Sequence, residues 1–293
     1  MDVQHPRRRP GVARLSALAA GVALVASGCS VEAQRGFLPG AEDGEQVTNM
    51  TERITTLWTG SWIAALAVGI ITWGLVLWCV AVYRKRRDDD TLPVQLRYHV
   101  PLEIMYVILP ILMIGVLYFY TERDTAAIED ISASPDVTVQ VVGKQWSWDF
   151  NYLDDDVYET GQHVIDVGTP GNPDDLPTLY LPVDERVEIQ LQSRDVIHSF
   201  WVPAFLYKKD MIPGRTNVFQ IVPTNEGVYA GKCAELCGEF HSGMLFNVAV
   251  VSREEYDAQM EALRDAGQTG SLGSDLDRTQ NRGDDNAIPS GEG

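Results

Sequence analysis

The sequence predicts a membrane protein with a hairpin of two transmembrane helices followed by an all-β sandwich or barrel. Three observations predict this fold class. Two apolar stretches, residues 60–83 and 101–120, are long enough to cross a bilayer, and a cluster of basic residues lies between them. Short segments rich in β-branched and aromatic residues follow Pro135. A chain of 293 residues has room for both parts.

The charge of the chain excludes one class of partner. Lys and Arg total 23 against 41 Asp and Glu, which gives a formal net charge of −18. An acidic field of this strength repels phosphate backbones, so no nucleic acid partner is expected. Residues 1–120 carry 11 basic and 10 acidic side chains, whereas residues 121–293 carry 12 and 31. The acidity therefore belongs to the part that follows the apolar stretches.

The first 29 residues have the pattern of a bacterial export signal. Four arginines precede an apolar run over residues 15–26 that is too short to span a membrane. The run ends in Val-Ala-Ser-Gly-Cys29, which resembles a lipoprotein cleavage box and predicts a lipidated Cys29, although Ala26 stands where Leu is usual. The alternative is ordinary signal cleavage nearby with an unmodified Cys29. Residues 30–58 are then an exported N-terminal segment.

The transmembrane hairpin is expected over residues 59–121. At about 1.5 Å per residue, each apolar stretch reaches roughly 30 Å, the thickness of the hydrocarbon core. Aromatic residues of the kind that lie at membrane interfaces occur near the ends: Trp58, Trp62, Trp78, Tyr83, Tyr118 and Tyr120. The connecting loop carries Arg84, Lys85, Arg86, Arg87 and Arg97. Positive loops stay in the cytoplasm, so the C-terminal part is expected outside a bacterial cell membrane.

Seven short strands are expected in the exported domain, residues 132–252. Their number and spacing predict an antiparallel sandwich or barrel. They are residues 137–143, 146–152, 163–167, 187–192, 217–222, 228–232 and 245–251. Polar residues 154–177 predict an exposed loop around one strand, and helical spacing of apolar residues predicts a surface helix over 253–266. Residues 267–293 lack apolar periodicity and predict a disordered acidic tail.

A metal site is predicted by the segment Cys233-Ala-Glu-Leu-Cys237-Gly-Glu-Phe-His241-Ser-Gly-Met244. Soft sulfur with imidazole favours copper, whereas magnesium and calcium prefer oxygen, and structural zinc would leave Met244 unexplained. A mononuclear copper loop needs one cysteine, so the second cysteine indicates two thiolates that bridge two copper ions. Each copper then needs a terminal imidazole. His198, at the end of an apolar run, is the candidate for the second one.

An ordinary disulfide between Cys233 and Cys237 is the alternative interpretation, because the spacing permits it and an oxidising compartment favours it. In that case His198, His241 and Met244 need not converge. The other histidines are placed elsewhere: His5 in the signal, His99 in the cytoplasmic loop and His163 in the polar loop region.

Residues 50–265 contain four notable features: the hairpin, Gly-Lys-Gln-Trp-Ser-Trp, Val-Ile-His-Ser-Phe-Trp-Val-Pro and the Cys-x-Glu-x-Cys-Gly-x-x-His-x-x-Met motif. Together these features resemble cytochrome c oxidase subunit II. The resemblance implies a cupredoxin-like Greek-key domain with a binuclear CuA centre. The implied ligands are His198, Cys233, Cys237, His241, Met244 and the backbone carbonyl of Glu235. The resemblance also directs the Glu235 side chain to a magnesium or manganese ion at the boundary with subunit I, which suits a carboxylate.

Two further residues match family positions. Trp146 matches the aromatic residue where electrons arrive from cytochrome c; its alternative role is that of a core or interface aromatic. Glu103 matches the carboxylate at the entrance of a proton channel, and an ionisable group in a membrane helix is a functional candidate. Its alternative role is that of a helix-start carboxylate stabilised by the helix dipole.

A set of acidic residues is expected to form a docking surface for a basic cytochrome c domain, because complementary charge raises the encounter rate. The set is Asp149, Asp154, Asp155, Asp156, Glu159 and Asp195. The alternative is general solubility of an exported domain. Arg194 departs from the acid that relatives often place beside the position of Asp195, which changes the shape of this patch.

The resemblance implies a subunit that receives electrons from cytochrome c, or from a tethered c-type haem domain, and passes them to haem in subunit I, where oxygen is reduced and protons are pumped. Its other implied partners are the remaining oxidase subunits and membrane lipid; haem belongs only to the partner. Nitrous oxide reductase would lack the hairpin, and a quinol oxidase subunit would lack the copper ligands. A tethered copper chaperone or thiol reductant is the alternative from another class, but Gly238 follows the second cysteine where such proteins carry Pro.

Overall fold

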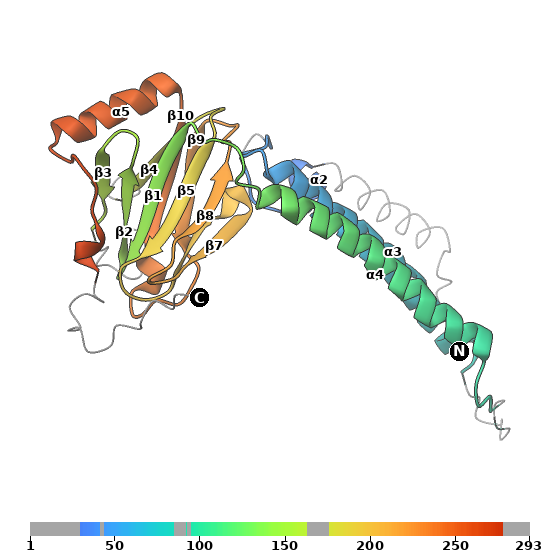
Figure 1. Ribbon diagram of the computed structural model, residues 1–293. Helices are drawn as coiled ribbons and strands as arrows, with labels where there is room; N and C mark the ends of the chain where they lie inside the picture. Colours follow the sequence, from blue (N-terminus) through green and yellow to red (C-terminus); the bar gives the residue numbers. More distant parts are fainter. Residues whose placement is uncertain (1–29, 42–43, 85–91, 93–94, 163–175, 278–293) are drawn as a thin grey trace, which may run out of the picture. The chain divides into compact units, whose positions relative to one another are not determined.

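The computed structural model describes residues 30–41, 44–84, 92, 95–162 and 176–277 (Figure 1). Contacts divide the chain into two units, Met1–Leu38 with Trp58–Arg87 and Pro39–Leu57 with Asp88–Gly293. Cys29 and the strand expected at 163–167 lie outside the described residues.

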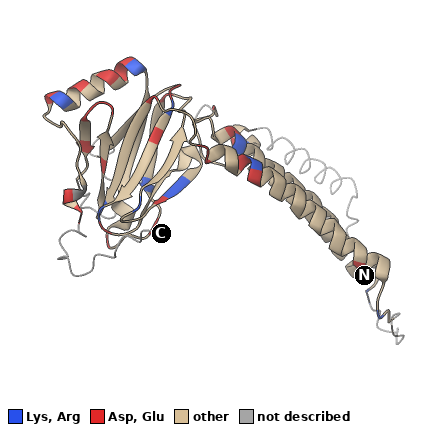
Figure 2. Cartoon of the chain, in the orientation of Figure 1, with Lys and Arg blue, Asp and Glu red and all other residues tan. Residues whose placement is uncertain are grey.

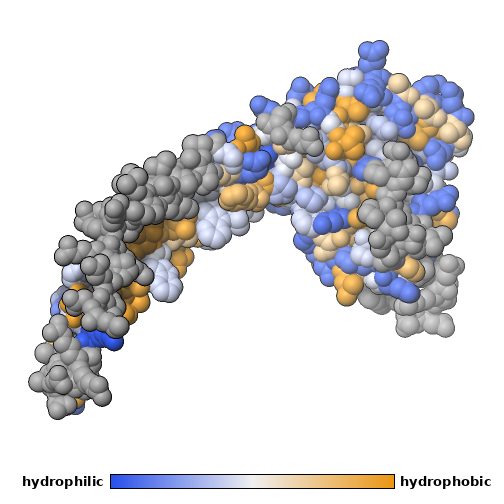
Figure 3. All heavy atoms as spheres, turned by 180° about the vertical axis from the view of Figure 1, so that it is seen from behind, coloured by the Kyte–Doolittle hydropathy of each residue, from blue (hydrophilic) through white to orange (hydrophobic). Residues whose placement is uncertain are grey.

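Two long apolar helices match the expected membrane-spanning stretches and extend beyond them. The short helix α2 (Val31–Gln34) precedes α3 (Thr51–Val82) and α4 (Val100–Ile128). Both long helices are long and apolar enough to cross a membrane. Their charged residues lie near the helix ends (Figure 2), and apolar side chains are exposed along the helices (Figure 3). The polar turns at 51–59 and 121–128 continue the helices because they contain no helix breaker.

The first turn of α4 is closed by a reciprocal pair of hydrogen bonds. The His99 ring accepts a hydrogen bond from the Leu102 N–H at 3.2 Å. The Glu103 carboxylate in turn accepts one from the His99 N–H at 2.8 Å. This satisfies two backbone donors that a helix start otherwise leaves without partners. Glu103 therefore has the helix-start role that the sequence left open as an alternative.

The exported domain is a sandwich of two five-stranded sheets. The first has the order β3-β2-β1-β5-β8 and the second β4-β10-β9-β6-β7. The strands are β1 (Val137–Lys144), β2 (Ser147–Tyr152), β3 (Val157–Thr160), β4 (Thr178–Pro182), β5 (Val187–Ser193), β6 (His198–Val202), β7 (Tyr207–Met211), β8 (Asn217–Ile221), β9 (Gly227–Cys233) and β10 (Leu245–Val251). The expectation of a purely antiparallel domain is wrong, because β1 pairs with β5, and β10 with β4, in parallel.

Aromatic rings fill the space between the sheets. Phe246 stacks on Phe200 with ring centroids 5.1 Å apart and lies 4.7 Å from Trp148. All three side chains are almost completely buried. Helix α5 (Arg253–Asp265) begins at the cap residue Ser252, and its Tyr256, Met260 and Leu263 are buried on the domain. These aromatic contacts hold the strands that carry the candidate ligands.

The expected disordered tail is wrong for residues 267–277, which we call the C-terminal strap. The Tyr158 N–H donates to the Gln268 carbonyl at 3.0 Å, and the Gly270 N–H donates to the Asp156 carbonyl at 2.7 Å. The Leu272 N–H also donates to the Asn151 side chain at 2.9 Å. Backbone groups rather than a periodic apolar face hold this segment, which explains why its hydropathy pattern indicated disorder.

Candidate metal centre

Two neighbouring strand pairs bring the candidate ligands together. His198 begins β6 and Cys233 ends β9, and these strands are antiparallel partners, so the two residues lie at one end of the sheet. The next strand, β10, is antiparallel to β9, and the Cys233 N–H donates to the Met244 carbonyl at 3.0 Å. The loop from Cys233 to Met244 is thereby closed. It carries Cys237 and, in a 3-10 turn, His241.

The ligand atoms of this loop and of His198 form one cluster. The Cys233 and Cys237 sulfurs lie 3.9 Å apart. The His198 Nδ1 lies 3.9 Å from the Cys233 sulfur, and the His241 Nδ1 lies 3.6 Å from the Cys237 sulfur. The Met244 sulfur is 3.8 Å from Cys237, and the Glu235 carbonyl oxygen is 3.2 Å from Cys233. The structure thus brings together all six groups that the sequence singled out.

The cluster is not a disulfide. Cys233 and Cys237 are free thiols, and both are buried. Moreover, His198, His241 and Met244 converge on the two sulfurs, which a disulfide does not require. Two soft thiols with two imidazoles and a thioether suit copper, and the described residues contain a His/Cys group that could hold a metal, formed by His198, Cys233 and Cys237.

The two thiols differ in acidity. Burial raises the pKa of Cys233, but hydrogen bonds from His198 and from the backbone of Glu235 and Ser199 outweigh it and lower this pKa to about 6. Burial and the neighbouring Cys233 raise the pKa of Cys237 to about 12. Metal binding requires both thiols to lose their protons.

The orientation of His198 is fixed by its surroundings. Its Nε2 lies 2.8 Å from the Asp195 carboxylate, which also accepts hydrogen bonds from the N–H groups of Gln145 at 2.7 Å and Val196 at 2.8 Å. A carboxylate on one ring nitrogen leaves the other nitrogen free to face a metal. Gly143 lies against the ring, since a Cβ there would be 3.0 Å from two ring atoms. Sequence reasoning missed Gln145 and Gly143, although both belong to the Gly-Lys-Gln-Trp motif.

Trp146 lies beside the cysteine loop. Its Nε1 donates to the Cys237 carbonyl at 3.3 Å, and its ring is edge-on to Phe240 at 5.0 Å. The Gln145 side chain donates to the same carbonyl at 2.7 Å. The structure therefore places this half-buried ring one hydrogen bond from a candidate ligand residue and packs it against Phe240.

The side chain of Glu235, unlike its backbone carbonyl, lies outside the cluster. The Glu235 side chain is exposed and adjoins the exposed Leu236. The His/Cys/Asp/Glu group found among the described residues does not include Glu235.

Two of the expected docking acids are not on the surface. Asp149 is 1 % exposed and pairs with Lys144 at 2.6 Å and with Arg194 at 3.0 Å. The Asp195 side chain is 6 % exposed and is occupied by His198. Both are therefore unavailable to a partner, and their expected role is wrong. Asp154 and Asp156 are exposed, and half-buried Asp155 accepts a hydrogen bond from Tyr256 at 2.8 Å.

Glu159, another of the expected docking acids, is half-buried, and this predicts a pH effect. It accepts a hydrogen bond from the Thr178 N–H at 2.7 Å, and burial raises its pKa to about 7. The folded protein thus binds this proton more tightly than the unfolded chain, so the stabilisation is complete below about pH 4.5 and is lost as the pH rises through 7. We expect Glu159→Gln to stabilise the domain by about 2 kcal/mol at pH 8 and hardly at pH 5. Unfolding temperatures at both pH values test this; an equal gain at both would contradict it.

The fold and the site define a β-sandwich protein with two helices long enough to cross a membrane and a cluster of two cysteines and two histidines that could hold a metal. Residues 137–251 match the family described as "Cytochrome C oxidase subunit II, periplasmic domain". The chain is 43% identical over 307 residues to a "Probable cytochrome c oxidase subunit 2" of Streptomyces avermitilis, with 94% of each chain covered. It is 33% identical to the "Cytochrome c oxidase subunit 2" of Mycobacterium tuberculosis, covering 84% of this chain and 80% of that protein.

Among solved structures, the periplasmic domain of subunit II of cytochrome oxidase from Bradyrhizobium japonicum is 30% identical. It covers 46% of this chain and 99% of that one, with a TM-score of 0.41. On the strength of the relatives, the chain belongs to the cytochrome c oxidase subunit II family. The protein is therefore a subunit of an oxidoreductase complex and works with other oxidase subunits. Its two apolar helices are long enough to cross a membrane, and its C-terminal domain matches a family described as a periplasmic domain.

Proposed function

We propose that this chain is the subunit that accepts electrons from cytochrome c, or from a tethered c-type haem domain, and delivers them to haem in subunit I. The observation that carries the proposal is the arrangement of the site: two buried sulfurs lie 3.9 Å apart, and each faces the Nδ1 of a different histidine. When bound there, two copper ions supply a one-electron couple shared between both metals.

Each residue of the site has a defined task in this proposal. The Cys233 and Cys237 thiolates would hold both copper ions, the His198 and His241 imidazoles would each bind one of them, and Met244 and the Glu235 carbonyl would be weaker ligands. A site buried between two sheets excludes water and holds its ligands in place. Such rigidity keeps structural rearrangement small when an electron arrives or leaves, which favours fast transfer.

The copper content and spectrum of the purified oxidase test the proposal. We expect this subunit to hold two coppers and to give a seven-line electron paramagnetic resonance signal of a mixed-valence pair. A single copper in this subunit, or a signal of isolated copper, would contradict the proposal and favour a chaperone. Since subunit I contributes copper of its own, a variant that lacks both His198 and Cys233 gives the reference content.

We propose a second metal at the Glu235 side chain. This carboxylate is exposed beside the buried copper ligands, and carboxylate oxygen suits magnesium or manganese. The remaining ligands would come from subunit I.

The chain would lie in a bacterial cell membrane with lipid around α3 and α4, the basic loop of residues 84–97 in the cytoplasm, and a lipid anchor at Cys29. The exposed acids Asp154 and Asp156, with Asp155, are the remaining candidates for donor docking.

Trp146→Phe is expected to slow electron transfer from cytochrome c by about tenfold, a barrier increase of about 1.4 kcal/mol. Phenylalanine keeps the ring contact with Phe240 but loses the hydrogen bond to the Cys237 carbonyl, and with it the direct connection to the cysteine loop. Stopped-flow reduction of the copper site by reduced cytochrome c measures this. Unchanged reduction rates with an unchanged copper spectrum would make Trp146 a packing residue only.

Glu103→Gln separates the two roles of this carboxylate. Glutamine still accepts a hydrogen bond from the His99 N–H, so the helix start is kept while the titratable proton is lost. If Glu103 serves a proton channel, steady-state turnover is expected to fall roughly tenfold while reduction of the copper site by cytochrome c stays at the wild-type rate. Wild-type turnover in Glu103→Gln would leave Glu103 with its capping role alone.

A further inference from the structure

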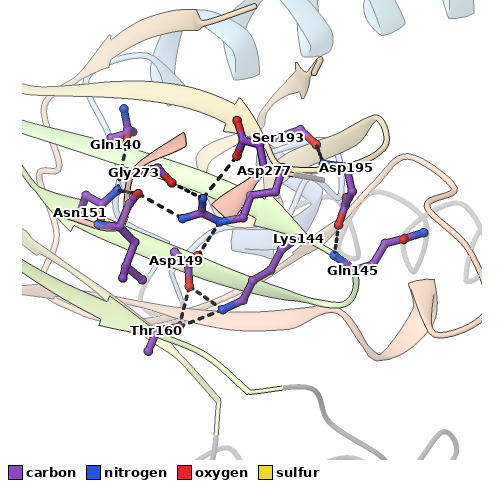
Figure 4. A network of polar contacts seen from close by, with 12 residues as sticks. Gln140, Lys144, Gln145, Asp149, Asn151, Thr160, Ser193, Asp195, Gly273 and Asp277 are labelled. Atoms are coloured by element: carbon purple, nitrogen blue, oxygen red, sulfur yellow. Dashed lines mark hydrogen bonds and ion pairs between the residues drawn. The ribbon is translucent and has the colours of Figure 1, made fainter. Parts of the chain in front are cut away.

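The Arg194 side chain ties the C-terminal strap to the core of the first sheet. Arg194 is 5 % exposed, and its Nε donates to the Asp149 carboxylate at 3.0 Å. Its Nη1 donates to the Gly273 carbonyl at 2.7 Å and its Nη2 to the Leu272 carbonyl at 3.1 Å. Asp277 adds an ion pair at 3.3 Å. All three nitrogens of the buried guanidinium are therefore engaged, and two of them hold the strap (Figure 4).

A second cation completes this network. Lys144 donates to the other oxygen of Asp149 at 2.6 Å and to Thr160 at 2.8 Å. Two cations and two carboxylates balance one another, which a buried cluster needs if it is to avoid the cost of an unpaired charge. Asp149 is thus the common anchor for two residues that are distant in sequence (Figure 4).

Both cations directly precede residues that orient the candidate copper ligands. Arg194 is followed by Asp195, whose carboxylate holds the Nε2 of His198 at 2.8 Å. Lys144 is followed by Gln145, whose N–H donates to the same carboxylate and whose side chain donates to the Cys237 carbonyl. The Arg194 N–H also donates to the Gly143 carbonyl at 3.0 Å, beside the His198 ring. The network therefore fixes the backbone on both sides of Asp195.

We propose that Arg194 and the C-terminal strap are positioning elements for the copper site: by clamping the backbone at residues 193–195, they set the hydrogen bond from the His198 ring to the Asp195 carboxylate and thereby tune the metal pair. This inference rests on the proposed copper function. Arg194 touches no ligand atom itself, so its effect passes through Asp195. Groups around a ligand's hydrogen-bond partner influence affinity and redox properties of a metal without binding it.

Two truncations of the full-length subunit, assembled in the oxidase complex, test the proposal. A chain that ends at Ser271 lacks Leu272, Gly273 and Asp277, whereas a chain that ends at Asp277 keeps the whole strap and is the matched control. The shorter chain is expected to shift the equilibrium constant for electron exchange between the copper site and a mediator by roughly three- to tenfold, with copper retained. The control chain is expected to match the full-length chain.

Point variants test the arginine separately. Arg194→Gln loses the ion pair with Asp149 and most of the hydrogen bonds that the guanidinium donates. It is expected to shift the equilibrium constant for electron exchange as much as the shorter chain does. Arg194→Lys keeps one charge toward Asp149 and is expected to show a smaller shift, because a lysine cannot serve both strap carbonyls in one plane. Arg253→Gln removes another arginine that pairs with a carboxylate, that of Glu185, and is expected to leave the equilibrium constant unchanged.

A readout that needs no copper separates this inference from the proposed function. Amide hydrogen exchange, measured by mass spectrometry on the metal-depleted complex, is expected to be at least about fivefold faster for the peptide that covers residues 193–198 in Arg194→Gln and in the shorter chain. Wild-type exchange and a wild-type electron equilibrium in both would overturn the positioning role. If the wild-type complex lacked a copper pair, the proposed function would be wrong. The amide hydrogen exchange result would still decide whether Arg194 and the C-terminal strap hold the backbone at residues 193–198.

Discussion

Replacing Cys233 with serine is expected to abolish the spectrum of a copper pair that shares its unpaired electron. The Cys233 sulfur lies 3.9 Å from both the Cys237 sulfur and the His198 Nδ1, so it stands between the two halves of the site. A serine hydroxyl is a hard, weakly acidic oxygen and cannot replace a thiolate between two soft metals. Oxidase turnover with cytochrome c is expected to drop by about 100-fold. Electron paramagnetic resonance of the purified complex measures the change directly.

Met244→Leu is the matched control for this loss. The Met244 sulfur lies 3.8 Å from Cys237 alone, and leucine fills a similar buried volume. Both thiolates and both imidazoles remain, so two coppers are expected to stay with a shifted potential. A seven-line spectrum that persisted in Cys233→Ser would refute the bridging role of Cys233 and leave Cys237 as the sole thiolate.

The composition of the site could be predicted because its chemistry is local. Two cysteines, a histidine and a methionine within one short segment leave few metals that suit them, and one distant histidine completed the set. The structure adds what holds these groups. Asp195 holds the His198 ring from three residues away, and the Gln145 N–H holds Asp195 through a hydrogen bond that spans 50 residues. No spacing rule reveals the second contact.

The expected docking surface shows that the charge of an acidic residue does not predict whether its side chain is exposed. Asp149 and Asp154 look alike in a list of acids, yet Asp149 is buried between two cations and Asp154 is exposed. The difference depends on Lys144 and Arg194, which meet only after the sheet has formed. The one signal in the sequence is the arginine itself, which stands beside Asp195 where relatives often place an acid.

The sequence did not predict four strands, β3, β4, β6 and β7, and two of them, β3 and β7, were missed for a similar reason. β7 carries two lysines and an aspartate in five residues, and β3 has four residues at a sheet edge, so neither shows apolar alternation. Edge strands are short and charged because they must not pair with other chains. The parallel pairing of β1 with β5 depends on contacts between residues some 50 apart and is set by the packed fold rather than by either strand.

Gly231→Ala is expected to cost the domain about 3 kcal/mol or more, because no space exists for a methyl group. A Cβ at this position would lie 2.2 Å from the Phe246 ring, which faces Gly231 across the β9–β10 ladder. That ring is fully buried against Phe200 and Trp148, so it cannot move without displacing them. A lower unfolding temperature and a lower copper content of the complex are the expected results.

The lower copper content expected for Gly231→Ala follows from where residues 231 and 246 lie relative to the ligand loop. Gly231 lies two residues before Cys233 on β9, and Phe246 lies two residues after Met244 on β10, so displacement of the ring reaches both ends of the ligand loop. Phe246→Leu in the same chain removes the clash and is expected to return most of the stability, beyond the sum of the two single changes. If the losses of stability in Gly231→Ala and Phe246→Leu simply add in the double variant, the clash with the Phe246 ring is not the reason that residue 231 is glycine. The backbone of β9 would then require it.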